Sequence, residues 1–284
     1  MRNSQTIKNI ELIQLEISQH PSVAIALSGG IDSITLAVLA GSIKTSSVMM
    51  FHAISPAVPP EATQRVRTLS KQFQWNLKEI DAGEFNDERY LNNPINRCFY
   101  CKESLYTAIF AIAKINASTI FSGTNSDDLL EYRPGLEAAL KLNVKHPFAK
   151  LGINKDMIRN IAHEMGLGDL ANLPSSPCLS SRIETGIPIQ KNTLGLVHQI
   201  ELLVDQTLKT STVRCRMRSS AVVIELDQAS LHTLLQPENS TLKNDLSQRI
   251  EEMLQKSHLF KKVSFDLYLT GSAFIGHKNE VYRI

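Results

Sequence analysis

Short apolar runs alternate with amphipathic stretches through the first half of the chain. Three runs have the composition of buried strands, and a fourth, residues 75–81, is a further predicted strand. The three runs are residues 23–27, 47–52 and 118–121. Apolar residues recur at helical spacing in three other stretches, which are residues 32–40, 61–73 and 102–114. This alternation predicts an α/β fold with a parallel sheet that carries helices on both faces.

The pattern changes after residue 173. Residues 174–189 contain three prolines and a glycine, which indicates an ordered loop. A predicted helix and two segments of alternating polarity follow. They are residues 194–209, 212–218 and 221–227. We therefore expect a parallel-sheet domain at residues 1–175 and a smaller α+β domain at residues 190–284.

The first predicted strand ends in Ser28-Gly29-Gly30, and Asp32 and Ser33 follow in the first turn of the next helix. Backbone N–H groups at a helix start favour anions, and glycine lets a phosphate approach closely. The Gly-Lys-Ser/Thr of a Walker loop is absent from this stretch, so no lysine follows to hold a γ-phosphate. Such a loop suits pyrophosphate and favours cleavage of ATP between the α and β phosphates. An ordinary strand-to-helix turn is the alternative.

A second glycine turn, Gly123-Thr124-Asn125, follows the strand at residues 118–121. Ligands of parallel sheets bind beyond the carboxyl ends of the strands, so this turn, the Ser-Gly-Gly turn and His52 should converge on one crevice. Asp127 is a candidate Mg²⁺ ligand, although Asn, Ser and Asp in this stretch also suit the start of a helix. Arg133 could bind phosphate or carboxylate, or form a surface salt bridge.

Four cysteines are present, and two of them, Cys98 and Cys101, form a Cys-x-x-Cys pair at a predicted helix start before Lys102. A helix N-terminus and a nearby cation lower the pKa of a thiol, so both sulfurs could be nucleophiles or ligands. With Cys178 as a third ligand they would leave one iron of a [4Fe–4S] cluster open. A zinc site and a pair of buried thiols are the alternatives. Cys215 lies in a strand-like stretch and is more typical of packing.

Composition narrows the classes of function. The chain has 284 residues, 43% of them hydrophobic, and 30 Lys and Arg against 28 Asp and Glu give a net charge of +2. This balance provides no general affinity for nucleic acid, although a local basic patch would still be compatible with it. No apolar run approaches the ~20 residues that span a bilayer, and the start lacks the apolar centre of a secretory signal. We therefore expect a cytoplasmic protein.

The Ser-Gly-Gly-x-Asp-Ser pattern resembles the PP-loop family of ATP pyrophosphatases. Together with "NRCFYCK", "GTNSDDLLEYRPGLEAA" and "PCLSSRIETGIPI", it closely resembles one subfamily over about residues 20–225. These are the ATP-dependent sulfur transferases of lactate racemase maturation, which build the nickel-pincer nucleotide. The resemblance implies that a carboxylate of pyridinium-3,5-biscarboxylic acid mononucleotide is adenylated and then receives sulfur.

The resemblance also implies roles for individual residues. It implies that the ATP phosphates are held by Ser28, Gly29, Gly30, Asp32 and Ser33, and that Arg214 and Arg216 contact the substrate. The further candidates for ATP binding are His52, Lys102, Gly123, Thr124 and Asp127, and those for substrate binding are Arg133 and Arg182. An exposed basic strand face is the alternative for Arg214 and Arg216, and bracing of the loop is the alternative for Arg182. Members with only the cysteine that matches Cys178 sacrifice its sulfur, whereas members with three cysteines hold a [4Fe–4S] cluster, so we expect the cluster type.

We further expect a homo-oligomer, as in this subfamily, that acts on a small-molecule nucleotide and works with other cofactor-assembly proteins. One departure concerns the family's Tyr-Arg pair before a late Gly-Ser, because Leu269-Thr270 precede Gly271-Ser272 here. The small domain and its substrate could therefore have diverged. Thiolation of tRNA by the same chemistry, and a non-catalytic protein that binds nucleotide or stores a cluster, are the competing functions.

Overall fold

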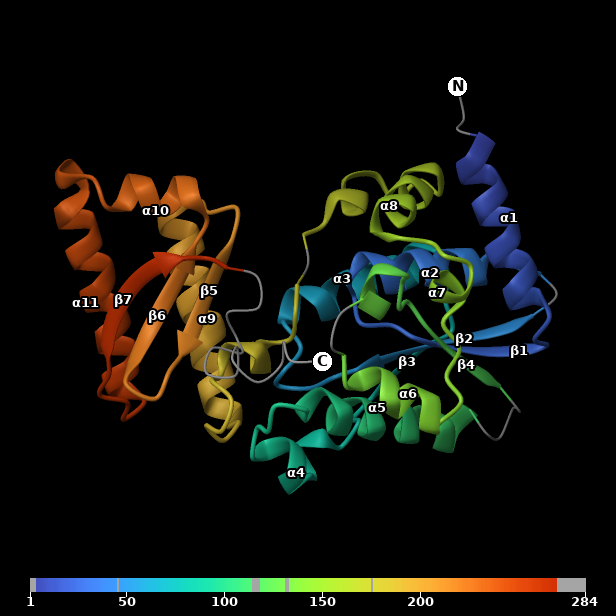
Figure 1. Cartoon of the computed structure of the whole chain (residues 1–284), viewed down its shortest axis with the longest axis horizontal. Helices are drawn as coiled ribbons and strands as arrows, with labels where there is room; N and C mark the ends of the chain where they lie inside the picture. The colour runs from blue at the N-terminus through green and yellow to red at the C-terminus, as the bar shows by residue number, and fades with distance from the viewer. Residues whose placement is uncertain (1–3, 45, 114–117, 131–132, 175, 270–284) are drawn as a thin grey trace. The chain divides into compact units, whose positions relative to one another are not determined.

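The computed structural model describes residues 4–44, 46–113, 118–130, 133–174 and 176–269 (Figure 1). The chain forms two compact units. The first takes in the chain up to Tyr90 and Asn96–Ser176, and the second takes in Leu91–Ile95 and the chain from Pro177 onward. The sequence pattern shows no sign that residues 91–95 pack with the second unit. The assignment of functional domains to residues 1–175 and 190–284 stays a prediction.

A four-stranded sheet forms the centre of the first unit. Its strands are β1 (Ser22–Ala26), β2 (Ser47–Ala53), β3 (Leu77–Ile80) and β4 (Thr119–Ser122). They lie in the order β3-β2-β1-β4, and every neighbouring pair is parallel. β1 is therefore a central strand, and its residues 23–26 are buried because both faces of the sheet are covered. The predicted α/β fold with a parallel sheet is confirmed.

Helices cover both faces of this sheet (Figure 1). One core joins it to four helices through side chains such as Ile13, Ile34, Val66 and Ile158. These helices are α1 (Ser4–Ser18), α2 (Ile31–Gly41), α3 (Pro60–Gln72) and α8 (Lys155–Glu164). The other face packs on α5 (Arg97–Ala113), where Tyr106 and Ile109 are buried, and α6 (Gly135–Lys141) packs alongside α5. Short segments complete the unit, namely α4 (Glu88–Leu91), α7 (Pro147–Lys150), η1 (Glu84–Asn86), η3 (Asp127–Leu130) and η4 (Gly168–Asn172).

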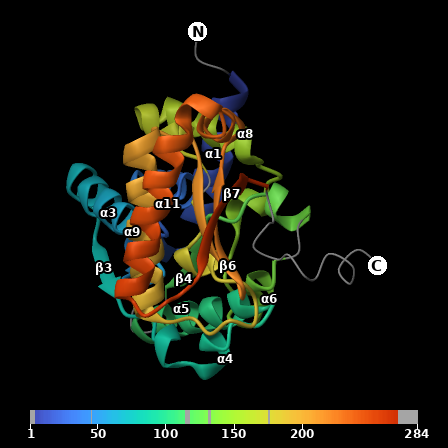
Figure 2. The same cartoon turned by 90° about the vertical axis from the view of Figure 1, so that its left-hand side faces the viewer.

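The second unit has a three-stranded sheet in the order β5-β6-β7. Its strands are β5 (Val213–Met217), β6 (Ala221–Leu226) and β7 (Lys262–Leu267), and its helical segments are α9 (Lys191–Leu208), α10 (Gln228–Leu234), α11 (Ser240–Lys256), η5 (Leu179–Arg182) and η6 (Pro237–Asn239). Figure 2 shows α9 and α11 side by side over the sheet. Cys215 is fully buried opposite Ile224, as expected of a packing residue. Because side chains alternate along a strand, Arg214 and Arg216 belong to the opposite face.

Residues 91–95 enter the second unit through Asn93. This side chain is fully buried, and its backbone takes the left-handed conformation (φ 52°) that asparagine tolerates. Its side-chain amide donates to the carbonyl oxygens of Glu184 (2.8 Å) and Ile187 (2.9 Å), and its backbone carbonyl accepts from the N–H of Gly186 (2.9 Å). Asn93 therefore ties this short segment to the loop that follows η5.

None of the described helices is long and apolar enough to cross a membrane. The sequence departs from the subfamily at Leu269-Thr270, which stand where Tyr-Arg is expected. The structure describes Leu269, whereas Thr270, Gly271 and Ser272 lie outside the described residues.

Candidate active site

The Ser-Gly-Gly loop joins β1 to α2. Gly29 has a φ of 84°, in the left-handed region where glycine is favoured, and a Cβ atom there would lie 2.9 Å from the carbonyl oxygen of Ala62 in α3. Gly30 precedes the first turn of α2, whose first backbone N–H groups have no carbonyl within the helix to bond. The loop therefore brings a helix N-terminus and a glycine turn to the carboxyl end of a central strand.

Ser33 shapes this loop from within. Its hydroxyl is nearly buried, donates to the carbonyl of Gly30 (3.0 Å) and accepts from the backbone N–H of Ser28 (3.1 Å). The Ser28 hydroxyl lies 3.0 Å from it and accepts from the N–H of Gly30 (3.3 Å). The Ser33 hydroxyl is thus engaged in the turn, which leaves backbone N–H groups as the main donors for an anion.

The second glycine turn lies against the first. A Cβ atom at Gly123 would be 2.7 Å from the backbone nitrogen of Ser33 and 2.8 Å from the carbonyl carbon of Asp32. Real Cβ atoms essentially never approach backbone so closely, so only glycine fits here. The loops that follow β1 and β4 are therefore in contact, as the parallel sheet predicts.

Lys155 joins both loops from the start of α8. Its ammonium group donates to both carboxylate oxygens of Asp32, at 2.7 and 2.8 Å, and its backbone N–H donates to Asp127 (2.9 Å). Burial raises the pKa of Asp32, and the hydrogen bond and charge of Lys155 oppose that rise. Lys155 is a candidate site residue that the motifs did not reveal, because it lies far from both loops in sequence.

The acidic residues after β4 are held in a compact turn. The side-chain oxygen of Asn125 accepts the backbone N–H groups of Asp127 (2.9 Å) and Asp128 (3.2 Å), and Arg133 forms an ion pair with Asp128 at 2.7 Å. Carboxylate oxygens are the ligands that Mg²⁺ prefers, and one or two of them with phosphate oxygens suffice for a nucleotide complex. Asp32 and Asp127, which share Lys155, therefore fit an ATP-bound Mg²⁺.

His52 is part of the fold at this edge of the sheet. Its ring is buried, with Nδ1 2.8 Å from the carbonyl oxygen of Leu27 and Nε2 2.9 Å from the hydroxyl of Thr63. Because a carbonyl only accepts, Nδ1 carries the hydrogen and Nε2 accepts from Thr63. Burial lowers the pKa of His52, so the ring is neutral. Both nitrogens bond within the protein, which leaves its backbone as the part that could meet a nucleotide.

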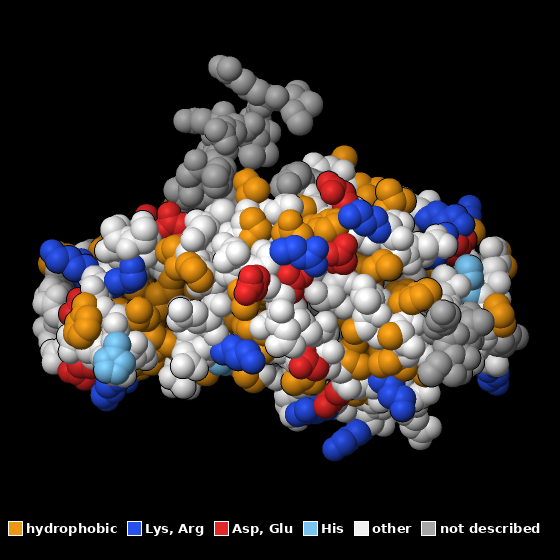
Figure 3. Space-filling model, turned by 90° about the horizontal axis from the view of Figure 1, so that it is seen from below, with side chains coloured by type: hydrophobic (Ala, Val, Ile, Leu, Met, Phe, Trp, Pro, Cys, Tyr) orange, Lys and Arg blue, Asp and Glu red, His pale blue; other side chains and the backbone are white. Residues whose placement is uncertain are grey.

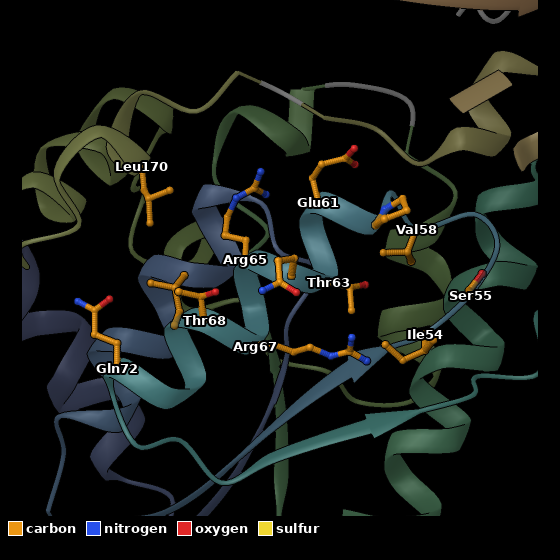
Figure 4. Close-up of a pocket in the computed structure, with 13 residues that line it drawn as sticks. Ile54, Ser55, Val58, Glu61, Thr63, Arg65, Arg67, Thr68, Gln72 and Leu170 are labelled. Carbon is orange, nitrogen blue, oxygen red and sulfur yellow. The ribbon is translucent and has the colours of Figure 1, made fainter. Parts of the chain in front are cut away.

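A cavity of about 840 Å³ lies along α3 (Figure 4). Its walls include Ile54 and Ser55 after β2, and Figure 4 shows Arg67 extending toward Ile54. Another wall residue, Arg65, donates to the carbonyl oxygen of Gly29 at 2.7 Å. The cavity therefore adjoins the Ser-Gly-Gly loop.

Lys102, another predicted site residue, lies on α5. Its ammonium group is 5.5 Å from the centre of the Tyr106 ring.

In the second unit, Arg182 braces the loop that presents Cys178. Cys178 is an exposed free cysteine, whereas the Arg182 side chain is 3% exposed. The guanidinium donates to the carbonyl oxygens of Pro177 (2.7 Å) and Cys178 (3.2 Å) and binds both carboxylate oxygens of Glu201 (2.9 and 3.1 Å). The structure thus gives Arg182 the bracing contacts that were the alternative to a substrate contact.

Arginines gather around this loop. Arg216 donates to Glu225 (2.9 Å) and to the carbonyl oxygen of Ser181 (2.8 Å), and Arg218 reaches Glu225 at 3.3 Å. Burial lowers the pKa of Arg214, and the nearby charge of Arg182 lowers it further. Arg182, Arg214, Arg216 and Arg218 thus form a strongly charged cluster with the Glu201 and Glu225 carboxylates.

The cysteines are divided between the units. Cys98 and Cys101 are half-buried on the first turns of α5, and Cys178 belongs to the second unit. Among the described residues, no three His, Cys, Asp or Glu side chains gather as a metal site. The [4Fe–4S] cluster on the three cysteines stays a prediction.

The Arg182–Glu201 pair leads to a prediction about stability. Arg182→Met is expected to lower the free energy of unfolding of the second unit by about 3–5 kcal/mol, because it leaves the Glu201 carboxylate buried without its partner. Urea denaturation would measure the change. Arg67→Met is the matched control, since its two-point pair with Glu79 is exposed and should matter little. Equal stability of both variants would contradict the bracing role.

Charges of both signs occur on the protein surface. On the face drawn in Figure 3, Lys and Arg side chains are interspersed with Asp and Glu. This mixed surface agrees with the net charge of +2. It offers no broad basic field on that face for a polyanion.

No family model matches the chain. The chain is 30% identical to the uncharacterized protein slr1717 of Synechocystis sp. over 213 residues, which cover 75% of this chain and 79% of that protein. The chain belongs to the same family as slr1717. This family member is also 27% identical over 247 residues to pyridinium-3,5-bisthiocarboxylic acid mononucleotide synthase of Lactiplantibacillus plantarum, covering 86% of this chain and 85% of the synthase. It is therefore a distant homologue of that synthase.

A third relative is one of the subunits of the glutamine-hydrolyzing GMP synthase of Methanopyrus kandleri, at 25% identity over 226 residues, or 73% of this chain and 70% of that relative. This likeness and the four-stranded parallel sheet are consistent with a PP-loop-like domain. Homology to an ATP-using synthase supports enzyme activity in this family member.

Proposed function

We propose that this protein is an ATP-dependent sulfur transferase that adenylates a carboxylate of a pyridinium mononucleotide and replaces its oxygen with sulfur. The observation that carries the proposal is its likeness to the bisthiocarboxylic acid mononucleotide synthase over 247 residues. The contact between the Ser-Gly-Gly loop and Gly123 supports it, because it brings the glycine turn and the helix start that suit phosphate close to the Asp32 carboxylate.

ATP would bind with its β and γ phosphates on the glycine turn and the first N–H groups of α2. Lys155 and Arg133 would offset phosphate charge, and Asp32 and Asp127 would hold the Mg²⁺. The cavity along α3 offers room for another part of the nucleotide. A carboxylate oxygen of the substrate then attacks the α-phosphorus, and the bond to the pyrophosphate oxygen breaks.

Adenylation is needed because a free carboxylate resists attack by sulfur nucleophiles, whereas AMP is a good leaving group. Sulfur attacks the carbonyl carbon, the bond to the AMP oxygen breaks, and a thiocarboxylate forms. Cys178 is the exposed thiol for this step. If Cys178 gives up its own sulfur, its Cβ–S bond breaks and its α-proton leaves, so that dehydroalanine remains. Arg214 and Arg216 on β5, which match the Arg-x-Arg strand of the sulfur transferases, would contact the substrate phosphate.

We further propose that Cys98, Cys101 and Cys178 hold a [4Fe–4S] cluster. The support for this proposal is the sequence, which has a cysteine at each of the three positions that match the cluster-bearing sulfur transferases. The cluster would supply sulfide on the iron that has no cysteine ligand. Brown, anaerobically purified protein with about four irons per chain is the expected result. Colourless protein whose Cys178 loses the mass of one sulfur after turnover would show sacrifice instead.

Pyrophosphate release tests the proposed function as a whole. Purified protein with ATP, Mg²⁺ and pyridinium-3,5-biscarboxylic acid mononucleotide should release pyrophosphate, and mass spectrometry should find the thiocarboxylate. The control omits the carboxylated nucleotide and should release far less pyrophosphate. Salt-sensitive retention and thiolation of bulk tRNA, with no reaction of the mononucleotide, would contradict the proposal.

A further inference from the structure

Three polar side chains form a hydrogen-bonded chain at the carboxyl end of β4. The hydroxyl of Ser122, which is 5% exposed, lies 2.8 Å from Nδ1 of His146 and 3.1 Å from the hydroxyl of Thr124. His146 lies just before α7 and is half-buried. We call His146, Ser122 and Thr124 the hydroxyl relay. Thr124 belongs to the second glycine turn, whereas Ser122 and His146 lie outside both turns.

The relay ends at the candidate nucleotide site. Thr124 directly follows Gly123, which packs against the backbone of Asp32 and Ser33 in the first turn of α2. The carbonyl oxygen of Thr124 accepts from the N–H of Ala149, which fixes the backbone at this point. The hydroxyl of Thr124 therefore lies on the turn that meets the proposed phosphate-binding loop.

Counting hydrogens shows that the relay has two arrangements. Each hydroxyl carries one hydrogen, and a ring nitrogen either donates or accepts. If Nδ1 of His146 donates to Ser122, the Ser122 hydroxyl donates to Thr124, and the Thr124 hydroxyl remains available to donate to a ligand. If Nδ1 accepts from Ser122, Thr124 donates to Ser122 and offers a ligand only lone pairs.

We propose that His146 is a positioning residue for the nucleotide, which acts through Ser122 to decide whether the Thr124 hydroxyl donates to bound ATP. The proposal rests on the proposed function, because it takes ATP as the ligand. Phosphate oxygens only accept hydrogen bonds, so ATP selects the arrangement in which Nδ1 carries a hydrogen. His146 is thus coupled to the nucleotide without touching it.

The surroundings of His146 set the direction of the expected pH dependence. Burial lowers the pKa of His146, the charge of Lys102 on α5 lowers it further, and Asp128 on η3 raises it. The ring is therefore uncharged in the free protein at neutral pH. Protonation forces a hydrogen onto Nδ1, so ATP affinity should rise as pH falls through the pKa of His146.

The test measures the ATP dissociation constant by calorimetry between about pH 8 and about pH 5.5, the range in which histidines titrate. Wild-type protein should bind ATP about threefold to tenfold more tightly at low pH than at high pH. Ser122→Ala leaves His146 able to titrate but breaks the relay, so this increase in affinity should be lost. Titration of ATP itself is common to both proteins and cancels in the comparison. The same pH dependence in both proteins would overturn the inference.

Two further substitutions separate the relay from a structural role. His146→Asn places an amide N–H near the position of Nδ1, so ATP affinity should be high and independent of the relay's protonation. His146→Leu removes the ring nitrogen that competes for the Ser122 hydrogen, so its ATP affinity should also be independent of pH in this range, with an unchanged melting temperature in both variants. A tightening of ATP binding at low pH as large as in wild type, in either variant, would overturn the inference.

Nitrogen NMR of the labelled histidine rings provides a readout apart from affinity. ATP should move the Nδ1 signal of His146 toward that of a hydrogen-bearing nitrogen, and Ser122→Ala should abolish the move. An unmoved signal in ATP-bound wild-type protein would overturn the relay alone. Wild-type protein that binds no ATP would overturn the proposed function, and this inference with it.

Discussion

Replacing Cys178 by alanine is expected to abolish thiocarboxylate formation and to leave the ATP half-reaction intact. Cys178 is exposed, and its loop is held by Arg182, which bonds to Glu201 and to the backbone carbonyl of Cys178. Because these contacts do not use the thiol, the substitution should not disturb the fold. Adenylation uses the glycine turns of the first unit, which Cys178 does not belong to. Pyrophosphate release should therefore continue at least once per chain. Sulfur transfer should fall by about a thousandfold or more, as expected when the sulfur nucleophile, or a cysteine ligand of the cluster that carries it, is lost.

Cys215→Ala is the control for this experiment. Cys215 is fully buried on the helix-covered side of the second sheet, and burial raises the pKa of its thiol far above its ordinary value. It therefore has neither the access nor the thiolate character that sulfur transfer requires. The control should retain transfer. Full transfer by Cys178→Ala, measured by mass spectrometry of the product, would contradict the assigned role.

Gly123→Ala is expected to have the largest effect on the nucleotide site. The new Cβ would overlap the backbone of Asp32 and Ser33, at distances as short as 2.7 Å, and neither backbone can move without shifting α2 or β4. Overpacking of this kind costs about 3 kcal/mol, so the free energy of unfolding should fall by that amount. ATP binding should be lost with it, because the two loops separate.

Gly30→Ala is the matched comparison. A Cβ at Gly30 would meet only the Ser28 hydroxyl, at 3.6 Å, and its φ of −81° suits any residue. Its free energy of unfolding should stay within about 0.5 kcal/mol of wild type. Weaker ATP binding at unchanged stability would then report a close phosphate at this glycine. If Gly123→Ala is as stable as Gly30→Ala and still binds ATP, the contact between the loops does not matter for the site.

Local pattern was enough to predict the frame of the first unit. The strand predicted at residues 23–27 is β1 at Ser22–Ala26, and the helix predicted at residues 32–40 is α2 at Ile31–Gly41. Both succeed because apolar periodicity and a glycine turn are properties of neighbouring residues. The helix predicted at residues 102–114 begins earlier, at Arg97, and so includes the Cys-x-x-Cys pair.

The contacts that build the site could not be predicted in this way. Lys155 pairs with Asp32 across 123 positions of sequence, and no local pattern indicates such a partner. Arg182 follows Cys178 in a motif that fits substrate binding, but burial beside Glu201 directs its guanidinium to the loop. Asn93 packs with the second unit because its side-chain amide donates to backbone carbonyl groups there. No sequence pattern indicates which backbone carbonyl groups will accept such a bond.

The central claim is that ATP activates an acid group by transfer of AMP to its oxygen, and the fate of that oxygen tests it most directly. The substrate carboxylates are labelled with ¹⁸O, the protein is supplied with ATP and Mg²⁺, and the nucleotide products are analysed by mass spectrometry. We predict AMP that carries one ¹⁸O atom for each thiocarboxylate formed, because the sulfur displaces the labelled oxygen with AMP. Thiocarboxylate accompanied by unlabelled AMP, or by ADP and phosphate, would contradict the account.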